Sequence, residues 1–200
     1  MADNKTAVVI LGAGLGTRMK SAKPKVLHPI AGRPMIQHLM ASLEPLQPDS
    51  MRVIVGPEMD AVAAAVRPHP TVIQHERRGT AHAVATTREA LQGFAGDVLI
   101  VYGDTPLLTT ATLAKMIERR RQEPRPAIVV LGFRPADPAA YGRLIVDAEG
   151  RLDAIVEAKD ASAAELAIGL CNAGTMAVDA SVLFTLLAEV GNANAKGEYY

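Results

Sequence analysis

The stretch AVVILGAGLGTRM, residues 7–19, decides how this chain folds. Its first part, Ala7 to Gly12, is a continuous apolar run rich in β-branched residues, which is typical of a strand buried on both faces of a parallel sheet. Glycines directly after such a strand let backbone N–H groups gather around an anion. Because ligands of open α/β sheets bind at the carboxyl ends of the strands, this stretch predicts an anion-binding loop at that edge.

Similar apolar runs recur along the chain and alternate with amphipathic segments. The further runs are Arg52 to Gly56, Thr71 to Gln74, Asp97 to Asp104 and Ala127 to Phe133. We expect three helices. The first begins at Pro34 and has apolar residues at helical spacing through Leu43, and the other two cover Ala81 to Leu91 and Thr110 to Arg121. This alternation predicts an α/β fold with a doubly wound, mostly parallel sheet. After it, RLIVDAEGRLDAIVE (143–157) reads as two strands around a turn, so we expect a β-hairpin that forms a small second lobe.

Composition narrows the class of protein. The chain has 200 residues, which suits one domain, and its 21 basic and 21 acidic residues cancel. Because the net charge is zero, the protein has no overall positive potential that would attract nucleic acid or an anionic membrane, and we expect neither as a partner. No apolar run is long enough to span a bilayer, and the N-terminus does not resemble a signal peptide, so we expect a cytoplasmic protein. Arg119, Arg120 and Arg121 close an expected helix and are interpreted as a solvated helix end.

The glycine loop does not belong to either of two common nucleotide-binding types. A dinucleotide-binding G-x-G-x-x-G motif would need glycine at position 17, where Thr17 stands, and the second apolar run ends at Gly56 without an acidic residue. A P-loop would need Gly-Lys-Ser/Thr at its end, which is absent. The remaining pattern is a glycine loop followed by Arg18 and Lys25, whose cations suit phosphate oxygens.

Two polar residues at strand ends are candidates for further site functions. Asp104 follows a buried strand, and a carboxylate there suits Mg²⁺, although it could instead cap a helix beginning at Thr105. Gln74 ends the third apolar run, where its amide could pair with the edge of a base or simply lie on the surface. His82 belongs to no metal-ligand spacing and is expected to cap or pack the helix after Thr80.

The loop and its surroundings also resemble a known family. The pattern L-x-A-G-x-G-T-R-M-x₄-P-K is similar to the signature of sugar-1-phosphate nucleotidylyltransferases. Six further motifs, in the same order, resemble the uridylyltransferase domain of the bacterial GlmU family. They are Gly79 to Ala83, Tyr102 to Leu107, Tyr141 to Arg143, Ile155 to Asp160, Asn172 to Gly174 and Lys196 to Tyr200. The resemblance covers nearly the whole chain. It implies a Rossmann-like nucleotidyltransferase fold with a sugar-binding hairpin lobe.

The resemblance also implies an activity and residue roles. UTP and N-acetylglucosamine-1-phosphate would give UDP-N-acetylglucosamine, a peptidoglycan and lipopolysaccharide precursor, and pyrophosphate. Arg18 and Lys25 would be catalytic, and Asp104 would bind Mg²⁺. The nucleotide would contact Leu11, Gly12, Ala13, Gly14, Lys25, Gln74, Gly79 and Thr80. The sugar phosphate would contact Thr80, Tyr102, Gly142, Glu157 and Asn172. Internal hydrogen bonds would satisfy Glu157 and Asn172 equally well.

Two departures from the family pattern bear on function. Arg77 and Arg78 stand where the family often has glutamine and an apolar residue. The chain also stops at Tyr200, before the family's second metal-binding asparagine and its left-handed β-helix acetyltransferase domain. We therefore expect residues 1–200 to form a nucleotide-sugar pyrophosphorylase domain that is incomplete at its C-terminus, does not trimerise, and frays at residues 197–200. Another sugar-1-phosphate nucleotidylyltransferase and a nucleotide-binding fragment without turnover are the alternatives.

Overall fold

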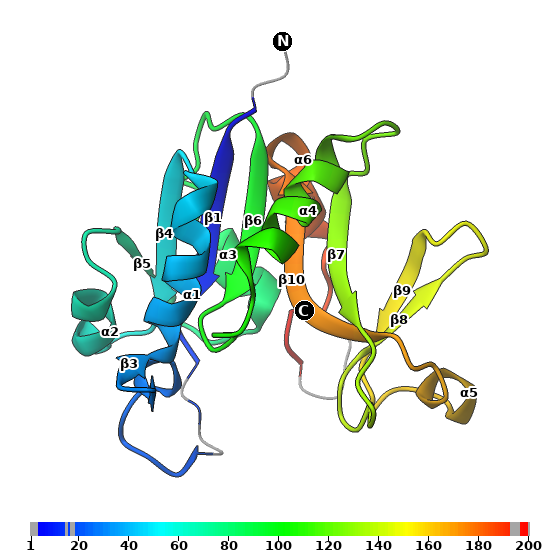
Figure 1. Cartoon of the computed structure of the whole chain (residues 1–200), viewed down its shortest axis with the longest axis horizontal. Helices are drawn as coiled ribbons and strands as arrows, with labels where there is room; N and C mark the ends of the chain where they lie inside the picture. The colour runs from blue at the N-terminus through cyan, green and yellow to red at the C-terminus, as the bar shows by residue number, and fades with distance from the viewer. Residues whose placement is uncertain (1–3, 15, 17–18, 193–196, 200) are drawn as a thin grey trace.

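The computed structural model describes residues 4–14, 16, 19–192 and 197–199. Its centre is a sheet in the order β5-β4-β1-β6-β10-β8-β9, with β7 also paired to β10 (Figure 1). The strands β1 (Thr6–Leu11), β4 (Ser50–Val55), β5 (Thr71–Ile73) and β6 (Asp97–Tyr102) are parallel to one another. Strand β10 (Cys171–Asp179) then runs antiparallel to both β6 and β7 (Ile128–Phe133).

Helices cover both faces of the sheet, as the continuous apolar runs predict. Along β1, Val8 and Ile10 lie in a core with α1 (Met35–Leu43) and α4 (Thr110–Arg121). The alternate residues, Ala7 and Val9, lie in a second core with α3 (Thr80–Ala85) and α6 (Ala180–Glu189). In Figure 1 the first pair of helices lies in front of the sheet and the second pair behind it. The predicted doubly wound fold is confirmed, and it places the carboxyl ends of β1, β4, β5 and β6 at one edge.

The remaining elements are short. They are the 3-10 helices η2 (Lys25–Leu27) and η3 (Glu44–Leu46), strands β2 (Pro29–Ile30) and β3 (Arg33–Pro34), and helices α2 (Asp60–Ala65) and α5 (Ala163–Leu166). Helix α3 ends at Ala85, earlier than the expected Leu91. The hydroxyls of Thr86 and Thr87 donate to the carbonyls three residues back, at 2.6 and 2.7 Å. These side-chain bonds compete with helical hydrogen bonds and favour turns.

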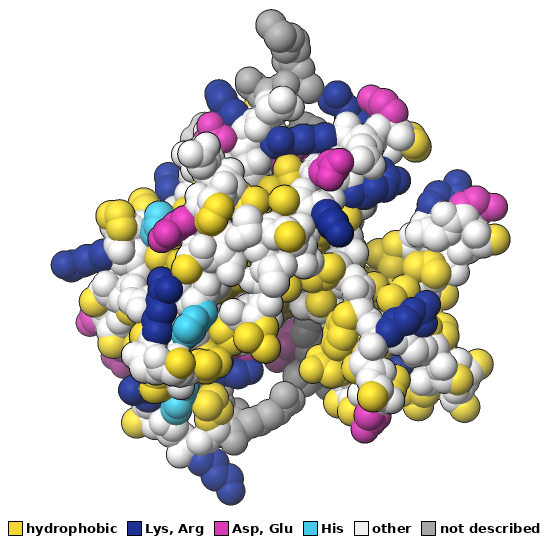
Figure 2. Space-filling model, viewed as in Figure 1, with side chains coloured by type: hydrophobic (Ala, Val, Ile, Leu, Met, Phe, Trp, Pro, Cys, Tyr) yellow, Lys and Arg dark blue, Asp and Glu magenta, His cyan; other side chains and the backbone are white. Residues whose placement is uncertain are grey.

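The expected β-hairpin is present as β8 (Arg143–Val146) and β9 (Leu152–Val156). Gly150 has a positive φ of 77° in the turn between them, a conformation that glycine adopts without strain. Figure 1 shows the hairpin projecting from the sheet, with α5 below it. Its outer surface carries apolar side chains in the space-filling view (Figure 2). The exposed large apolar residues of the chain include Val146, Leu152 and Ile155 in the hairpin and Leu166 in α5.

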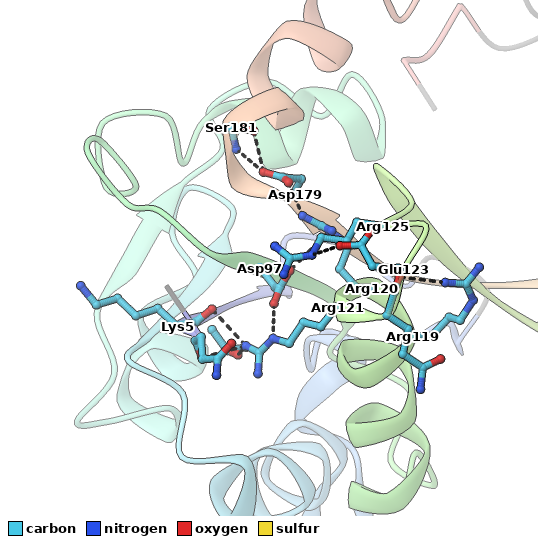
Figure 3. Close-up of polar contacts among 12 residues, drawn as sticks. Lys5, Asp97, Arg119, Arg120, Arg121, Glu123, Arg125, Asp179 and Ser181 are labelled. Atoms are coloured by element: carbon cyan, nitrogen blue, oxygen red, sulfur yellow. Dashed lines mark hydrogen bonds and ion pairs between the residues drawn. The ribbon is translucent and has the colours of Figure 1, made fainter. Parts of the chain in front are cut away.

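The three arginines at the end of α4 are not all solvated, which corrects the expectation from the sequence. Arg120 is only 6% exposed and forms ion pairs with Asp97 and Asp179 (Figure 3). Arg121 also pairs with Asp97, with its Nε 2.6 Å from the carboxylate. Asp97 begins the buried strand β6, so its charge needs cationic partners inside the fold. This ion cluster lies at the edge of the sheet opposite the glycine loop.

Within the part of the chain that the structure describes, no helix has both the length and the apolarity of a membrane span.

Candidate active site

The glycine loop leaves β1 between the ends of two neighbouring strands. The N–H of Gly12 donates to the carbonyl of Ile54 in β4 at 2.8 Å, and Gly103, after β6, donates to the carbonyl of Leu11 at 2.9 Å. A side chain at Gly12 would come within 3.0 Å of that Ile54 oxygen. The strand ends therefore fix the start of the loop and require glycine at position 12.

Lys25 packs against the same loop. Gly16 has a φ of +61°, and a Cβ placed there would lie 2.6 Å from the Cβ of Lys25. The spacing between the last loop glycine and Lys25 thus brings the lysine back onto the loop. Arg18, the other predicted catalytic cation, lies outside the described residues.

Asp104 lies two residues beyond β6 and forms an ion pair with the Nζ of Lys25. It caps no helix, because α4 begins later and its N-cap is Thr109, whose hydroxyl accepts from the N–H of Thr112. A partly exposed carboxylate beside a phosphate-type loop fits a hard divalent cation. Among the described residues, no group of three His, Cys, Asp or Glu side chains gathers into a metal site.

Gln74 is buried at the base of the site rather than on the surface. Its side chain is tied to the first turn of α3, because its Nε2 donates to the carbonyl of Gly79 at 3.3 Å and lies 3.2 Å from Nδ1 of His82. A carbonyl only accepts, so this geometry fixes which end of the amide faces Gly79. The amide oxygen then has no hydrogen-bond partner among the described residues.

These groups line one cavity of about 250 Å³ at the carboxyl edge of the parallel strands. The described lining includes the predicted metal ligand Asp104 and these predicted nucleotide-site residues: Leu11, Ala13, Gly14, Lys25, Gln74, Gly79 and Thr80. Gly12 lies behind the wall, bonded to β4. The structure therefore brings together residues between positions 11 and 104 that the sequence assigns to a nucleotide and a metal.

A second cavity, of about 320 Å³, lies between β6 and the hairpin lobe. Its lining includes Thr80, Tyr102, Glu157 and Asn172, four of the five residues assigned to the sugar phosphate. The fifth, Gly142, lies behind Glu157: a Cβ on it would be 3.2 Å from the Glu157 carboxylate, and its carbonyl accepts from the N–H of Asn172 at 2.8 Å. Thr80 and Tyr102 belong to both cavities, so the two cavities share a wall.

Tyr102 is the polar centre of this shared wall. Its hydroxyl and that of Thr80 are hydrogen-bonded at 3.0 Å. Burial raises the pKa of the Tyr102 phenol, the bond to Thr80 lowers it, and the charges of Asp104 and Glu157 raise it further, so that the net shift is upward. A neutral hydroxyl can therefore face both cavities across the physiological pH range.

Comparison with known proteins places this site in a family. A model of the MobA-like NTP transferase domain matches residues 8–167. The chain belongs to this family. Over 196 residues it is 64% identical to the bifunctional protein GlmU of Rhodospirillum rubrum, and over 200 residues it is 56% identical to the bifunctional protein GlmU of Paramagnetospirillum magneticum. These alignments cover 98% and 100% of the chain but only 44% of either relative.

Solved structures show the same fold. HddC from Yersinia pseudotuberculosis, complexed with GMP-PN, superposes with a TM-score of 0.70 at 25% identity, covering 89% of this chain and 78% of that one. A UDP-glucose pyrophosphorylase complexed with UDP-glucose gives a TM-score of 0.76 at 17% identity, covering 98% and 83%. The resemblance drawn from the sequence motifs is confirmed. The chain is a nucleotidyltransferase-type domain.

Tyr199, in the C-terminal tail of this NTP transferase domain, is hydrogen-bonded to the rest of the fold, contrary to our expectation that residues 197–200 fray. Tyr199 donates to the carbonyl of Arg78 at 2.7 Å and accepts from the N–H of Ala81 at 3.0 Å. The tail thus crosses the turn before α3, and Glu198 joins the lining of the first cavity.

Sequence reasoning did not predict the contacts that three residues make at or beside the first cavity. Arg77 lines it and donates to the loop carbonyl of Ala13, His82 orients Gln74, and Glu198 reaches it from the tail. The sequence signalled Arg77 only as a departure from the family pattern. The contacts of His82 and Glu198 depend on how α3 and the tail pack, and no local pattern encodes that packing.

Proposed function

We propose that this NTP transferase domain transfers UMP from UTP to N-acetylglucosamine-1-phosphate, giving UDP-N-acetylglucosamine and pyrophosphate. The observation that carries the proposal is the pair of cavities divided by Thr80 and Tyr102. One cavity has a glycine loop, a lysine and a carboxylate, and the other is lined by polar groups that match sugar hydroxyl and acetamido groups. Such an arrangement suits a reaction between two bound substrates. The GlmU relatives support the choice of substrates.

The reaction needs alignment and charge neutralisation rather than a base. The second pKa of a phosphate monoester is about 6, so the sugar phosphate is already largely ionised at neutral pH. One of its oxygens forms a bond to the α-phosphorus of UTP, while the bond from that phosphorus to the bridging oxygen breaks and pyrophosphate leaves with the electron pair. Lys25 and Arg18 would hold the phosphates, and backbone N–H groups of Ala13 and Gly14 would support them.

Asp104 would hold the divalent cation that we expect to be Mg²⁺. When bound, this ion would neutralise charge on the phosphate oxygens of both substrates. Lys25, which pairs with Asp104, would keep the carboxylate oriented toward the first cavity. In the second cavity, Glu157 and Asn172 would contact the sugar. The Oδ1 of Asn172 accepts from the N–H of Gly174 at 2.8 Å, which fixes its amide and leaves the amide nitrogen for a sugar oxygen.

A pyrophosphate-release assay with a panel of nucleoside triphosphates and sugar-1-phosphates tests the proposal. We expect release with UTP and N-acetylglucosamine-1-phosphate together, and none when either is omitted. Lys25→Ala should abolish release, while Lys23→Ala, an exposed lysine two residues away, should leave it unchanged.

Other outcomes would replace the proposal. A preference for a different substrate pair would assign the chain to another sugar-1-phosphate nucleotidylyltransferase. UTP binding without turnover would favour a nucleotide-binding role. UTP and sugar phosphates are cytoplasmic metabolites, so we further propose a cytoplasmic location.

A further inference from the structure

We propose that Arg77 is a positioning residue for the nucleotide, because its guanidinium clamps the glycine loop in the conformation that receives phosphate. This inference rests on the proposed function only in assuming that the first cavity binds a nucleoside triphosphate. The Nε of Arg77 donates to the carbonyl of Ala13 at 2.8 Å, across 64 residues of sequence. Arg77 also lines the first cavity. The bond therefore joins the loop after β1 to the turn after β5.

The contact with Ala13 has a direct effect on the next amide. A peptide unit is planar and trans, so the carbonyl of Ala13 and the N–H of Gly14 point in opposite directions. When Arg77 holds that carbonyl, it also directs the Gly14 N–H away from itself. Gly14 lines the cavity, and its N–H has no hydrogen-bond partner among the described residues. Arg77 thus fixes in advance a donor suited to a phosphate oxygen.

Gly56 provides the space that the clamp needs. A Cβ at Gly56 would lie 2.2 Å from an Nη atom of Arg77 and 3.0 Å from its Cζ. The backbone at Gly56 does not have a positive φ, so its glycine is required for space and not for conformation. Gly56 directly follows β4, the strand whose Ile54 carbonyl accepts from Gly12. The loop is therefore held by two hydrogen bonds, one from Gly12 to Ile54 of β4 and one from Arg77 to Ala13.

Arg78 makes none of these contacts, although it is the other arginine that departs from the family pattern. Its Nε pairs with Glu76 at 2.5 Å, both side chains are well exposed, and the residue does not line the first cavity. Arg77 and Arg78 therefore form a natural pair of test and control. They carry the same charge in adjacent positions, and only one of the two contacts the glycine loop.

The test is to titrate the chain with UTP by calorimetry and with uridine by NMR. Loss of one hydrogen bond to a rigid loop should weaken UTP binding about tenfold in Arg77→Ala. Uridine lacks phosphates, so its affinity should stay within about twofold of the parent, as should UTP binding by Arg78→Ala. Gly56→Ala should weaken UTP binding like Arg77→Ala, because the new methyl group displaces the guanidinium. Combining Gly56→Ala with Arg77→Ala should add no further loss.

Several results would overturn the clamp. The first is unchanged UTP affinity in Arg77→Ala, and the second is an equal loss of affinity for UTP and uridine in that variant. The third is full UTP affinity in a folded Gly56→Ala, which would assign the effect of Arg77 to its charge alone. If Gly56→Ala does not fold, the comparison of UTP with uridine in Arg77→Ala decides. A parent chain that binds no nucleoside triphosphate would overturn the proposed function as well, whereas the other results leave that function standing.

Discussion

Under the proposed function, the side chain of Tyr102 would face both substrates. It ends β6, its hydroxyl bonds to Thr80 at the start of α3, and both residues line both cavities. Burial, and less strongly its neighbours Asp104 and Glu157, raise the pKa of the phenol, which favours its neutral form. A neutral donor at this junction adds no negative charge to a place where two phosphates would meet. The raised pKa therefore keeps the hydroxyl protonated for hydrogen bonding.

Asp104 should be essential for metal-dependent turnover. Replacing it with asparagine keeps the shape but gives a poor ligand for a hard dication, and it removes the partner of Lys25. We expect Asp104→Asn to fold and to lose turnover by a factor on the order of 10² or more, by analogy with the loss of one charge-stabilising group. Asp153→Asn, an exposed aspartate on β9, is the matched control. Steady-state turnover of Asp104→Asn within about threefold of the parent, well short of such a loss, would refute the role.

Gln74 should read the base through its amide oxygen. Its nitrogen is engaged by Gly79 and His82, which leaves an acceptor for the N3–H of uracil; cytosine has no hydrogen there. We expect the parent to prefer UTP to CTP, and Gln74→Ala to weaken UTP binding by about 1–3 kcal/mol, the cost of an unpaired polar group. Calorimetric titration measures both. Gln92→Ala, an exposed amide, should change neither, and equal affinity of the parent for UTP, CTP and ATP would contradict base selection.

At the level of elements, the sequence predicts the local features of the site and misses those made by distant segments. Glycines after an apolar strand predict the loop of β1, and polar residues at strand ends predict Gln74 and Asp104, because each pattern is local. The shortened α3 follows from Thr86 and Thr87, whose hydroxyl bonds a helical periodicity does not reveal. The contact of the tail with the turn before α3 joins residues over 100 positions apart, so no sequence pattern announces it.

Gly79 is the glycine on which this contact between tail and turn depends. It has a φ of +107°, and a Cβ on it would lie 2.3 Å from the carbonyl oxygen of Tyr199. Gly79→Ala should therefore strain the backbone by about 1–3 kcal/mol and also push the tail away. The amide of Ala81, which donates to Tyr199, should then exchange its hydrogen faster.

Gly93→Ala is the matched control for this variant. Gly93 also has a positive φ, +73°, but a Cβ there meets no atom within 4 Å. It should cost stability without changing exchange at Ala81. If hydrogen exchange, followed by mass spectrometry or NMR, shows the Ala81 amide equally protected in the parent and in Gly79→Ala, the tail does not depend on this glycine.

Across the whole molecule, the two edges of the sheet carry different features. The carboxyl edge of the parallel strands holds the cavities, while the opposite edge holds the cluster of Asp97, Arg120, Arg121 and Asp179 (Figure 3). The sequence predicts the doubly wound sheet because apolar runs mark buried strands. It does not predict the ion cluster, because three arginines at a helix end could equally well be exposed to solvent or form buried ion pairs. Only the packing of α4 beside the start of β6 and the end of β10 turns Arg120 inward, where it meets Asp97 and Asp179.

The ion cluster should govern stability and leave the site unaffected. Asp97 is 4% exposed and accepts from Arg121, whose guanidinium also reaches the carbonyl of Asn4 at 2.8 Å and the hydroxyl of Thr6 at 2.9 Å. Asp97→Asn leaves buried Arg120 with Asp179 as its remaining carboxylate. Removing one partner of a buried ion pair costs about 3–5 kcal/mol, because the other charge stays desolvated. We therefore expect a marked fall in the urea midpoint of Asp97→Asn.

The pH dependence of this cluster provides a second, independent readout. Although burial raises the pKa of Asp179, bonds from Ser181 and the charge of Arg120 outweigh it and hold that pKa below the usual value of 3.8. A carboxylate with a lowered folded-state pKa contributes stability above its unfolded-state pKa, and this contribution is lost as the pH falls through the folded-state value. The parent should therefore lose stability below about pH 4, and Asp179→Asn should lose less over that interval.

Arg151→Ala, which removes an exposed ion pair of the hairpin, is the control and should leave the urea midpoint unchanged at neutral pH. UTP affinity of folded Asp97→Asn should match the parent, and a large loss of binding at neutral pH would show that the two edges of the sheet are coupled.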